Sequence, residues 1–409
     1  MVRLGEAANC RKALRLLLVG ALLAGGAANA CTTNHDALAR RPNAGSPGGG
    51  TAGVSGFGSG GFGNTGNQAQ GGRDNPDVEP KGDNVLTIVN GVIDAPSVRV
   101  CFARVGDDGQ TGGFVGSPLP ELGYGASRVL TEIDGLSFVD DVIQPWVISG
   151  ELARLAKLDC RAAVALAQSE EAKVTPVASE PEAVGGAGSG GAAADGDAAL
   201  AGAGGSGEPL EFPTLRARPL AAMPAGTVDI GRSILLVLTG CMGGAAYTDR
   251  VATAACGAGY TPRTPTLEPV IVKLSRVVGF DTVGLQGVHA SQPTGVLDLR
   301  VSGDSGAVSL VFASSVSFGS IAPRPANTRF TPSELGVESF NFGLQAVDAS
   351  GAVAHQEAWS DILATSGLAT PVAARTYTAI FLGPDPLLLK EGWWNESAFA
   401  LIDNDPTRE

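Results

Sequence analysis

Ser305 has the most suggestive surroundings of any potential nucleophile in this sequence. The segment Gly303-Asp304-Ser305-Gly306-Ala307 has the form of a nucleophilic-serine motif. Such a serine needs a histidine base and an acidic residue that orients the base. After the first eighty residues the sequence offers only His289 and His355, and neither has a setting typical of a catalytic base. The turn of a β-hairpin explains the same Gly, Asp and Ser residues. We therefore assign no catalytic residue and predict that the protein is not an enzyme.

Metal ligands are equally sparse. His289 has no second histidine nearby, and the chain has no Cys-x-x-Cys pair, so a zinc site would lack ligands and a structural histidine is the better interpretation. Asp403 and Asp405, with Asp107 and Asp108, offer the oxygen ligands that calcium prefers, but their spacing is not that of an EF-hand loop. We predict no metal and no cofactor, and we keep Asp403 and Asp405 as weak calcium candidates.

Trp393 and Trp394 are weak candidates for ligand binding. Neighbouring residues on a strand point to opposite faces, so one ring is expected in the core. The other ring would stack on a sugar or cover a sheet edge. Burial is the commoner role of aromatic side chains, and the sequence does not identify a ligand.

The cysteines predict structural disulfides. Cys241 and Cys256 enclose a short Gly/Ala-rich loop, and a disulfide there is the simplest closure. Cys101 and Cys160 would then attach a helix to the opening sheet. Four cysteines allow three pairings, and the sequence does not choose between them.

The N-terminus has the features of an export signal. A basic segment (residues 11–15) precedes a short apolar run (16–24), and small residues (28–30) stand directly before Cys31. The run is too short to cross a bilayer as a mature helix. We predict a signal peptide over residues 1–30.

Two processing outcomes compete at Cys31. Ala28-Asn29-Ala30 suits ordinary signal peptidase, whereas a cysteine at the first mature position is what lipoproteins need, although Ala28 and Asn29 depart from the usual lipobox. Lipidation of Cys31 leaves four cysteines for disulfides once Cys10 is removed with the signal. Residues 31–83 are rich in Gly, Ser and Asn and predict a flexible tether that reaches roughly 40 Å. We predict a lipoprotein of the cell envelope, at the outer membrane, with a secreted form as the alternative.

Composition limits the partners. The formal net charge is −13 and the pI is about 4.8, which argues against nucleic acid as a partner. With 58 Gly, 25 Pro and only 17% charged residues, the chain favours turns and short strands over long helices.

A helix and a low-complexity block interrupt a pattern that otherwise indicates strands. Leucines at three-residue spacing predict a helix from Ser149 to Lys173, and an Ala/Gly-rich block follows to Pro209. Together they predict an insert over about 149–210. Alternation at Val98–Phe102 and the apolar runs Ile234–Leu238 and Tyr377–Leu382 predict strands.

The sequence also repeats itself. Three segments recur in the same order: residues 88–102 match 287–301, residues 122–125 match 316–319, and residues 232–240 match 375–383. We predict two tandem antiparallel β-sandwich (Ig-like) domains over 84–262 and 268–409, the first of which carries the insert. In the second copy, Val296–Phe312 predicts a hairpin, and Thr331-Pro332-Ser333-Glu334 predicts the start of a short helix.

The second copy carries the clearest resemblance to a known family. Its elements are an opening strand with His, an alternating strand, a Phe-Gly step, an R-x-Y-T-x-x-x-x-G segment and an acidic strand end: Val288–Ser291, Leu297–Leu299, Phe318–Gly319, Arg375–Gly383 and Leu401–Asp405. In these motifs the chain resembles the bacterial domain-of-unknown-function 4397 family. The resemblance implies an exported or lipid-anchored envelope protein with tandem β-sandwich domains, and it implies no catalytic residues.

These features predict a non-enzymatic cell-envelope lipoprotein that presents two β-sandwich domains for surface interaction, adhesion or structural support. Its partners would be the membrane, through the lipid on Cys31, and a surface protein or glycan. The alternative is a secreted polysaccharide-binding or hydrolytic protein, whose affinity for glycans would depend on Trp393 or Trp394.

Overall fold

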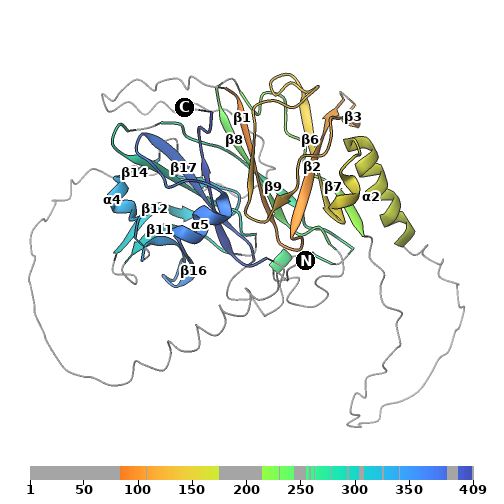
Figure 1. Cartoon of the computed structure of the whole chain (residues 1–409). Helices are drawn as coiled ribbons and strands as arrows, with labels where there is room; N and C mark the ends of the chain where they lie inside the picture. Colours follow the sequence, from red (N-terminus) through yellow and green to blue (C-terminus); the bar gives the residue numbers. More distant parts are fainter. Residues whose placement is uncertain are drawn as a thin grey trace, which may run out of the picture. The chain divides into compact units, whose positions relative to one another are not determined.

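A computed structural model gives the structure of the chain (Figure 1). The described residues are 83–106, 108–174, 214–229, 231–243, 255–257, 259–261, 263–277, 279–292, 294–303, 308–324, 327–339, 341–384 and 395–407. They all fall in one compact unit, Arg73–Glu409. The structure is mainly β, with 46% strand and 13% helix, as the composition predicts. Within the described ranges no helix is long and apolar enough to cross a membrane.

The first half of the described chain forms two sheets. Sheet 1 has the strand order β5-β1-β8-β9, and sheet 2 has the order β3-β2-β6-β7, with β4 paired to β2. The elements are β1 (Val85–Val92), β2 (Ser97–Val105), β3 (Thr111–Val115), β4 (Leu122–Gly123), β5 (Ser127–Leu130), β6 (Val142–Gly150), the 3₁₀ helix η1 (Leu152–Leu155), α2 (Cys160–Val174), β7 (Leu215–Pro219), β8 (Ser233–Gly240) and β9 (Glu268–Lys273).

The second half forms two further sheets with a closely similar strand order. Sheet 3 has the order β13-β10-β17-β18, with β14 also paired to β10, and sheet 4 has the order β12-β11-β15-β16. The elements are β10 (Val283–His289), β11 (Leu297–Gly303), β12 (Val308–Val316), β13 (Ile321–Ala322), β14 (Thr328–Phe330), α4 (Pro332–Leu335), β15 (Gly343–Asp348), β16 (Val353–Ala358), α5 (Trp359–Ser366), β17 (Arg375–Leu382) and β18 (Ala398–Asp403).

The strand register follows the sequence repeat. Val85 of β1 lies beside Ser233 of β8, and the residues that match them in the second half, Gly284 of β10 and Thr376 of β17, also lie side by side. The three matches in the sequence therefore correspond to equivalent places in two similar sets of strands.

Backbone hydrogen bonds repeat in the same way. The N–H of Gly125 donates to the carbonyl of Asn90 at 2.8 Å, and the N–H of Gly319 donates to the carbonyl of His289 at 2.9 Å. In the sequence repeat, Gly125 matches Gly319 and Asn90 matches His289. The Tyr/Phe-Gly segment is therefore hydrogen-bonded to the equivalent position of the opening strand in both halves.

Sheets 1 and 3 each contain one parallel pair, so the prediction of purely antiparallel sheets is wrong. β1 runs parallel to β8, and β10 runs parallel to β17. In each half the late strand returns beside the opening strand and in the same direction. The continuous apolar run in β8 suits this position, because strands buried on both faces lack the alternation of half-exposed strands.

Four apolar clusters lie between the layers. Sheets 1 and 2 share one cluster, sheets 3 and 4 share a second, sheets 1 and 3 share a third, and sheet 2 shares a fourth with α2. Leu236 and Val100 belong to the cluster of sheets 1 and 2, and Phe381 and Leu299 belong to that of sheets 3 and 4. Leu235 and Ile380 belong to the cluster of sheets 1 and 3, and Ile148 and Val164 belong to that of sheet 2 and α2. Sheets 1 and 3 are thus covered on both faces.

The helix predicted from Ser149 to Lys173 divides into three parts. Ser149 still belongs to β6, Leu152–Leu155 is a 3₁₀ turn, and α2 begins only at Cys160. The leucine spacing of three residues matches the period of a 3₁₀ helix better than that of an α-helix. Asp159 begins α2, because its carboxylate accepts the N–H of Ala162 at 2.7 Å.

The short helix predicted after Thr331 is confirmed. The Thr331 side chain accepts the N–H of Glu334, and the Glu334 carboxylate accepts the N–H of Thr331 at 2.7 Å. This reciprocal pair is the capping box that the sequence indicates. The predicted hairpin is also present, since β11 and β12 pair with Gly303 opposite Val308.

The cluster between sheets 1 and 3 generates a stability prediction. Ile380 is fully buried there, and Ile380→Ala removes methyl groups from a packed interior. We expect the free energy of unfolding to fall by about 2–4 kcal/mol in chemical denaturation. Val353→Ala, at a side chain that is 50% exposed, is the control and should change it by less than about 0.5 kcal/mol. Equal effects at the two positions would contradict burial between the sheets.

Candidate functional site

Several predicted site residues lie outside the described residues. They are Cys31, Asp107, the core of the serine motif at residues 304–307, Trp393 and Trp394. The signal peptide and the tether lie outside as well. The lipidation, the serine motif and the ligand candidates therefore stay predictions.

Both disulfides considered from the sequence are present. Cys101 of β2 is bonded to Cys160, the first residue of α2, and Cys241 is bonded to Cys256. The Cα–Cα distance is 5.5 Å in each pair, and the bonds span 59 and 15 residues. Loops of these lengths correspond to about 4 and 3 kcal/mol of chain-entropy stabilisation. The pairing that the sequence left open is thereby assigned, and its role is structural.

The weak calcium candidates are held by arginines. A carboxylate oxygen of Asp403 lies 2.7 Å from the Arg375 guanidinium, and one of Asp405 lies 3.7 Å from that of Arg276. Asp108 accepts the N–H of Gln110 in a turn. In the part of the chain that the structure describes, no three His, Cys, Asp or Glu side chains gather closely enough to hold a metal ion.

His289 is a buried histidine with hydrogen-bond partners on both ring nitrogens. Its Nδ1 accepts the N–H of Ser291 at 3.2 Å, so the proton is on Nε2, which lies 2.8 Å from the carbonyl oxygen of Gly295. Burial lowers the pKa of His289, while the carbonyls of Gly295 and Thr294 oppose that shift. The ring is therefore neutral, and its lone pair is already engaged, as the structural interpretation predicts.

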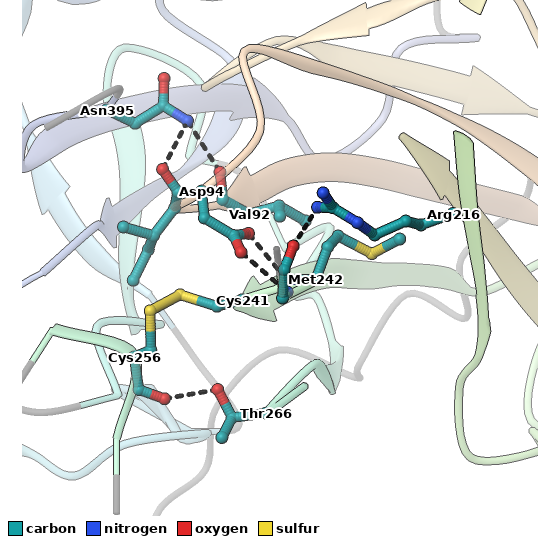
Figure 2. The surroundings of a disulfide bond; sticks show 10 residues. Val92, Asp94, Arg216, Cys241, Met242, Cys256, Thr266 and Asn395 are labelled. Atoms are coloured by element: carbon teal, nitrogen blue, oxygen red, sulfur yellow. Dashed lines mark hydrogen bonds between the residues drawn. A yellow bond between two sulfur atoms is a disulfide. The ribbon is translucent and has the colours of Figure 1, made fainter. Parts of the chain in front are cut away.

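The most unusual ionisable group is Asp94, in the turn between β1 and β2 (Figure 2). One carboxylate oxygen accepts the N–H of Met242 at 2.7 Å, and the other accepts the N–H of Gly243 at 2.8 Å. Met242 follows Cys241, so the carboxylate holds the β1–β2 turn against the segment that the disulfide closes. The side chain is buried, which is rare for an unpaired acid.

Arg216 of β7 approaches the same place from the edge of sheet 2 (Figure 2). Its Nη1 donates to the carbonyl of Gly243, whose N–H donates to Asp94. Its positive charge favours the ionised form of Asp94, although no direct hydrogen bond joins the two side chains. The backbone of Gly243 thus lies between a cation and an anion.

Asn395 of the second half completes the arrangement (Figure 2). Its side-chain Nδ2 donates to the carbonyls of Val92, Ile93 and Ala95, at 2.8, 3.1 and 2.7 Å. Three carbonyls at the β1–β2 turn therefore accept hydrogen bonds from one amide some three hundred residues later in the chain. The site is a meeting point of both halves, and its hydrogen bonds hold the backbone.

Burial gives Asp94 an acidity that is uncommon for an aspartate. Desolvation raises its pKa from 3.8 to about 6, and the N–H groups of Met242 and Gly243 and the charge of Arg216 oppose the rise. The group therefore changes charge in a mildly acidic range.

Sequence reasoning missed this site. Asp94, Arg216 and Asn395 come from three separate segments, and Asp94 has no matching acid in the second copy. The one local indication is a single charged residue in an otherwise apolar turn, Ile93-Asp94-Ala95-Pro96.

No known family's sequence model matches the chain, and no curated protein sequence matches it significantly.

The raised pKa of Asp94 predicts a pH dependence of stability. The folded state binds this proton more tightly than the unfolded chain, in which the pKa of Asp94 is near 3.8. The contribution of Asp94 to stability is therefore greatest below pH 4 and falls as the pH rises through about 6. The full difference corresponds to about 3 kcal/mol. We expect the unfolding free energy of the native chain, relative to Asp94→Asn, to decrease between pH 4 and pH 7 in urea titrations.

Arg216→Gln provides a second variant for the same measurement. Removing the cation should raise the pKa of Asp94 further, so the decrease should move to higher pH. A difference between native chain and Asp94→Asn that stays constant or grows with pH would show that burial does not dominate at this carboxyl.

Proposed function

We propose that this protein is a non-enzymatic lipoprotein of the bacterial cell envelope, anchored at the outer membrane through Cys31. Its body would be two β-sandwich domains, displayed on the tether of residues 31–83 for surface interaction, adhesion or structural support. The proposal combines the export features of residues 1–30 with the architecture of the described chain.

The pairing of the cysteines is the observation that carries the proposal. Cys101, Cys160, Cys241 and Cys256 are bonded to one another, so Cys31 is the one cysteine after the signal without a partner in the body. Disulfides are typical of exported proteins, and a lone cysteine at the first mature position is what lipidation requires. The two facts support the same route of export and anchoring.

The arrangement of the sheets supports a display role. In each half, two sheets share one apolar core, which is the packing that a sandwich requires. The buried polar side chains of Asp94 and Asn395 bind backbone groups. Such hydrogen bonds stabilise a scaffold.

The test is the intact mass of the mature N-terminal peptide from membrane and culture-fluid fractions of cells that produce the full chain. We expect a diacylglyceryl group on Cys31 and recovery in the membrane fraction. Cys31→Ser should move the protein to the soluble fraction, whereas Cys10→Ser, a matched change within the signal, should not.

An unmodified N-terminus in the medium, together with no effect of Cys31→Ser on fractionation, would refute the anchor. The secreted form would then be the correct interpretation.

A further inference from the structure

At one end of sheets 1 and 3 the described chain begins, and apolar side chains are exposed there. β1 and β8 start there in sheet 1, and β10 and β17 start there in sheet 3. We call it the entry end and define it by Asp83, the described residues among 276–282, and residues 372–374.

Arg276 links the parts of the entry end. Its guanidinium donates to the carbonyls of Asp83 and Gly231, each at 3.0 Å. Asp83 is the first described residue, and Gly231 lies just before β8. The segment that leads back to Cys31 therefore joins the body beside Arg276.

Three apolar side chains of the entry end are exposed. Phe280 is fully exposed (100%), Val277 is 41% exposed and Val372 is 51% exposed. The N–H of Ala374 donates to the carbonyl of Thr282 at 2.9 Å, which holds the loop of Val372 against the loop of Phe280. Scattered exposed valines are ordinary, but a fully exposed phenylalanine leaves a large apolar ring in water unless something covers it.

Two arginines near these side chains are paired with acids. The Arg276 and Arg375 guanidiniums pair with Asp405 and Asp403. The exposed Asp281 directly follows Phe280. The entry end therefore offers an anionic partner little electrostatic attraction. Apolar contact is the main interaction that it offers.

Resting on the proposed lipid anchor, we infer that the entry end is a membrane-facing surface that inserts Phe280 into the interfacial region of a phospholipid bilayer. The occupant is the bilayer that holds the lipid on Cys31, because the segment 31–82 ends at Asp83, within this surface. A tether that reaches roughly 40 Å keeps the body at high effective concentration near the bilayer, so a small apolar contact is sufficient to orient it.

The test uses the full lipidated protein with Phe280→Cys, reconstituted in vesicles of phosphatidylethanolamine and phosphatidylglycerol (3:1). The body cysteines are paired and Cys31 carries the lipid, so the new thiol alone takes an environment-sensitive fluorophore. Val353→Cys on β16, 50% exposed, is the matched control. We expect blue-shifted emission, quenching by spin-labelled lipid and protection from aqueous iodide at position 280, and an aqueous probe at 353.

Each other outcome overturns the inference. A probe at 280 that iodide quenches as strongly as the probe at 353 would leave the anchor intact but remove the bilayer contact. Protection from iodide without quenching by spin-labelled lipid would mean that a protein covers Phe280 instead. The intact mass of the labelled chain reports the lipid independently, so an unmodified Cys31 would reject the proposed function and this inference together.

Discussion

Burial of the central sheets on both faces is the constraint on which the structure depends. All eight residues of β1 and all eight of β8 are buried, as are the seven of β10. A buried polar group without a partner costs about 1–3 kcal/mol. The buried hydroxyls of Thr87 on β1 and Ser233 on β8 are such groups in the described chain. The packing of sheet 1 on sheet 3 also means that the two copies share a core, so the repeat in the sequence does not describe two independent bodies.

The contact between sheets 1 and 3 changes from apolar to polar toward the entry end. There the Nδ2 of Asn404 donates to the carbonyl of Ser275 at 2.8 Å, and its Oδ1 accepts the hydroxyl of Thr378 at 2.7 Å. The Oε1 of Gln286 accepts the N–H of Ser275 at 2.8 Å. These amides satisfy the backbone of the segment that connects the halves, and a network of this kind fixes one relative placement of the layers more specifically than apolar contact does.

Local chemistry explains what the sequence predicted correctly. The capping box at Thr331 and the alternation around Val100 are signals within a few residues, and the segments that repeat in the sequence take equivalent strand positions in the two halves. The sequence predictions failed where strand direction or the partners of a side chain depend on residues far away in the sequence. Whether β8 runs parallel to β1 depends on a return path of over a hundred residues, and the partners of Asp94 come from segments that the sequence does not connect.

The two copies differ on their outer sheets, and what covers each sheet explains the difference. Cys101 and Trp146 lie side by side on sheet 2 beneath α2. The matching pair on sheet 4 is Arg300 and Gln345, outside any apolar cluster in the described chain. A sheet face under a helix selects apolar residues and a disulfide that holds the helix, whereas the matching face without a helix selects polar ones. The helix of the insert is therefore part of the first copy's core, and the two copies cannot exchange this face without losing stability.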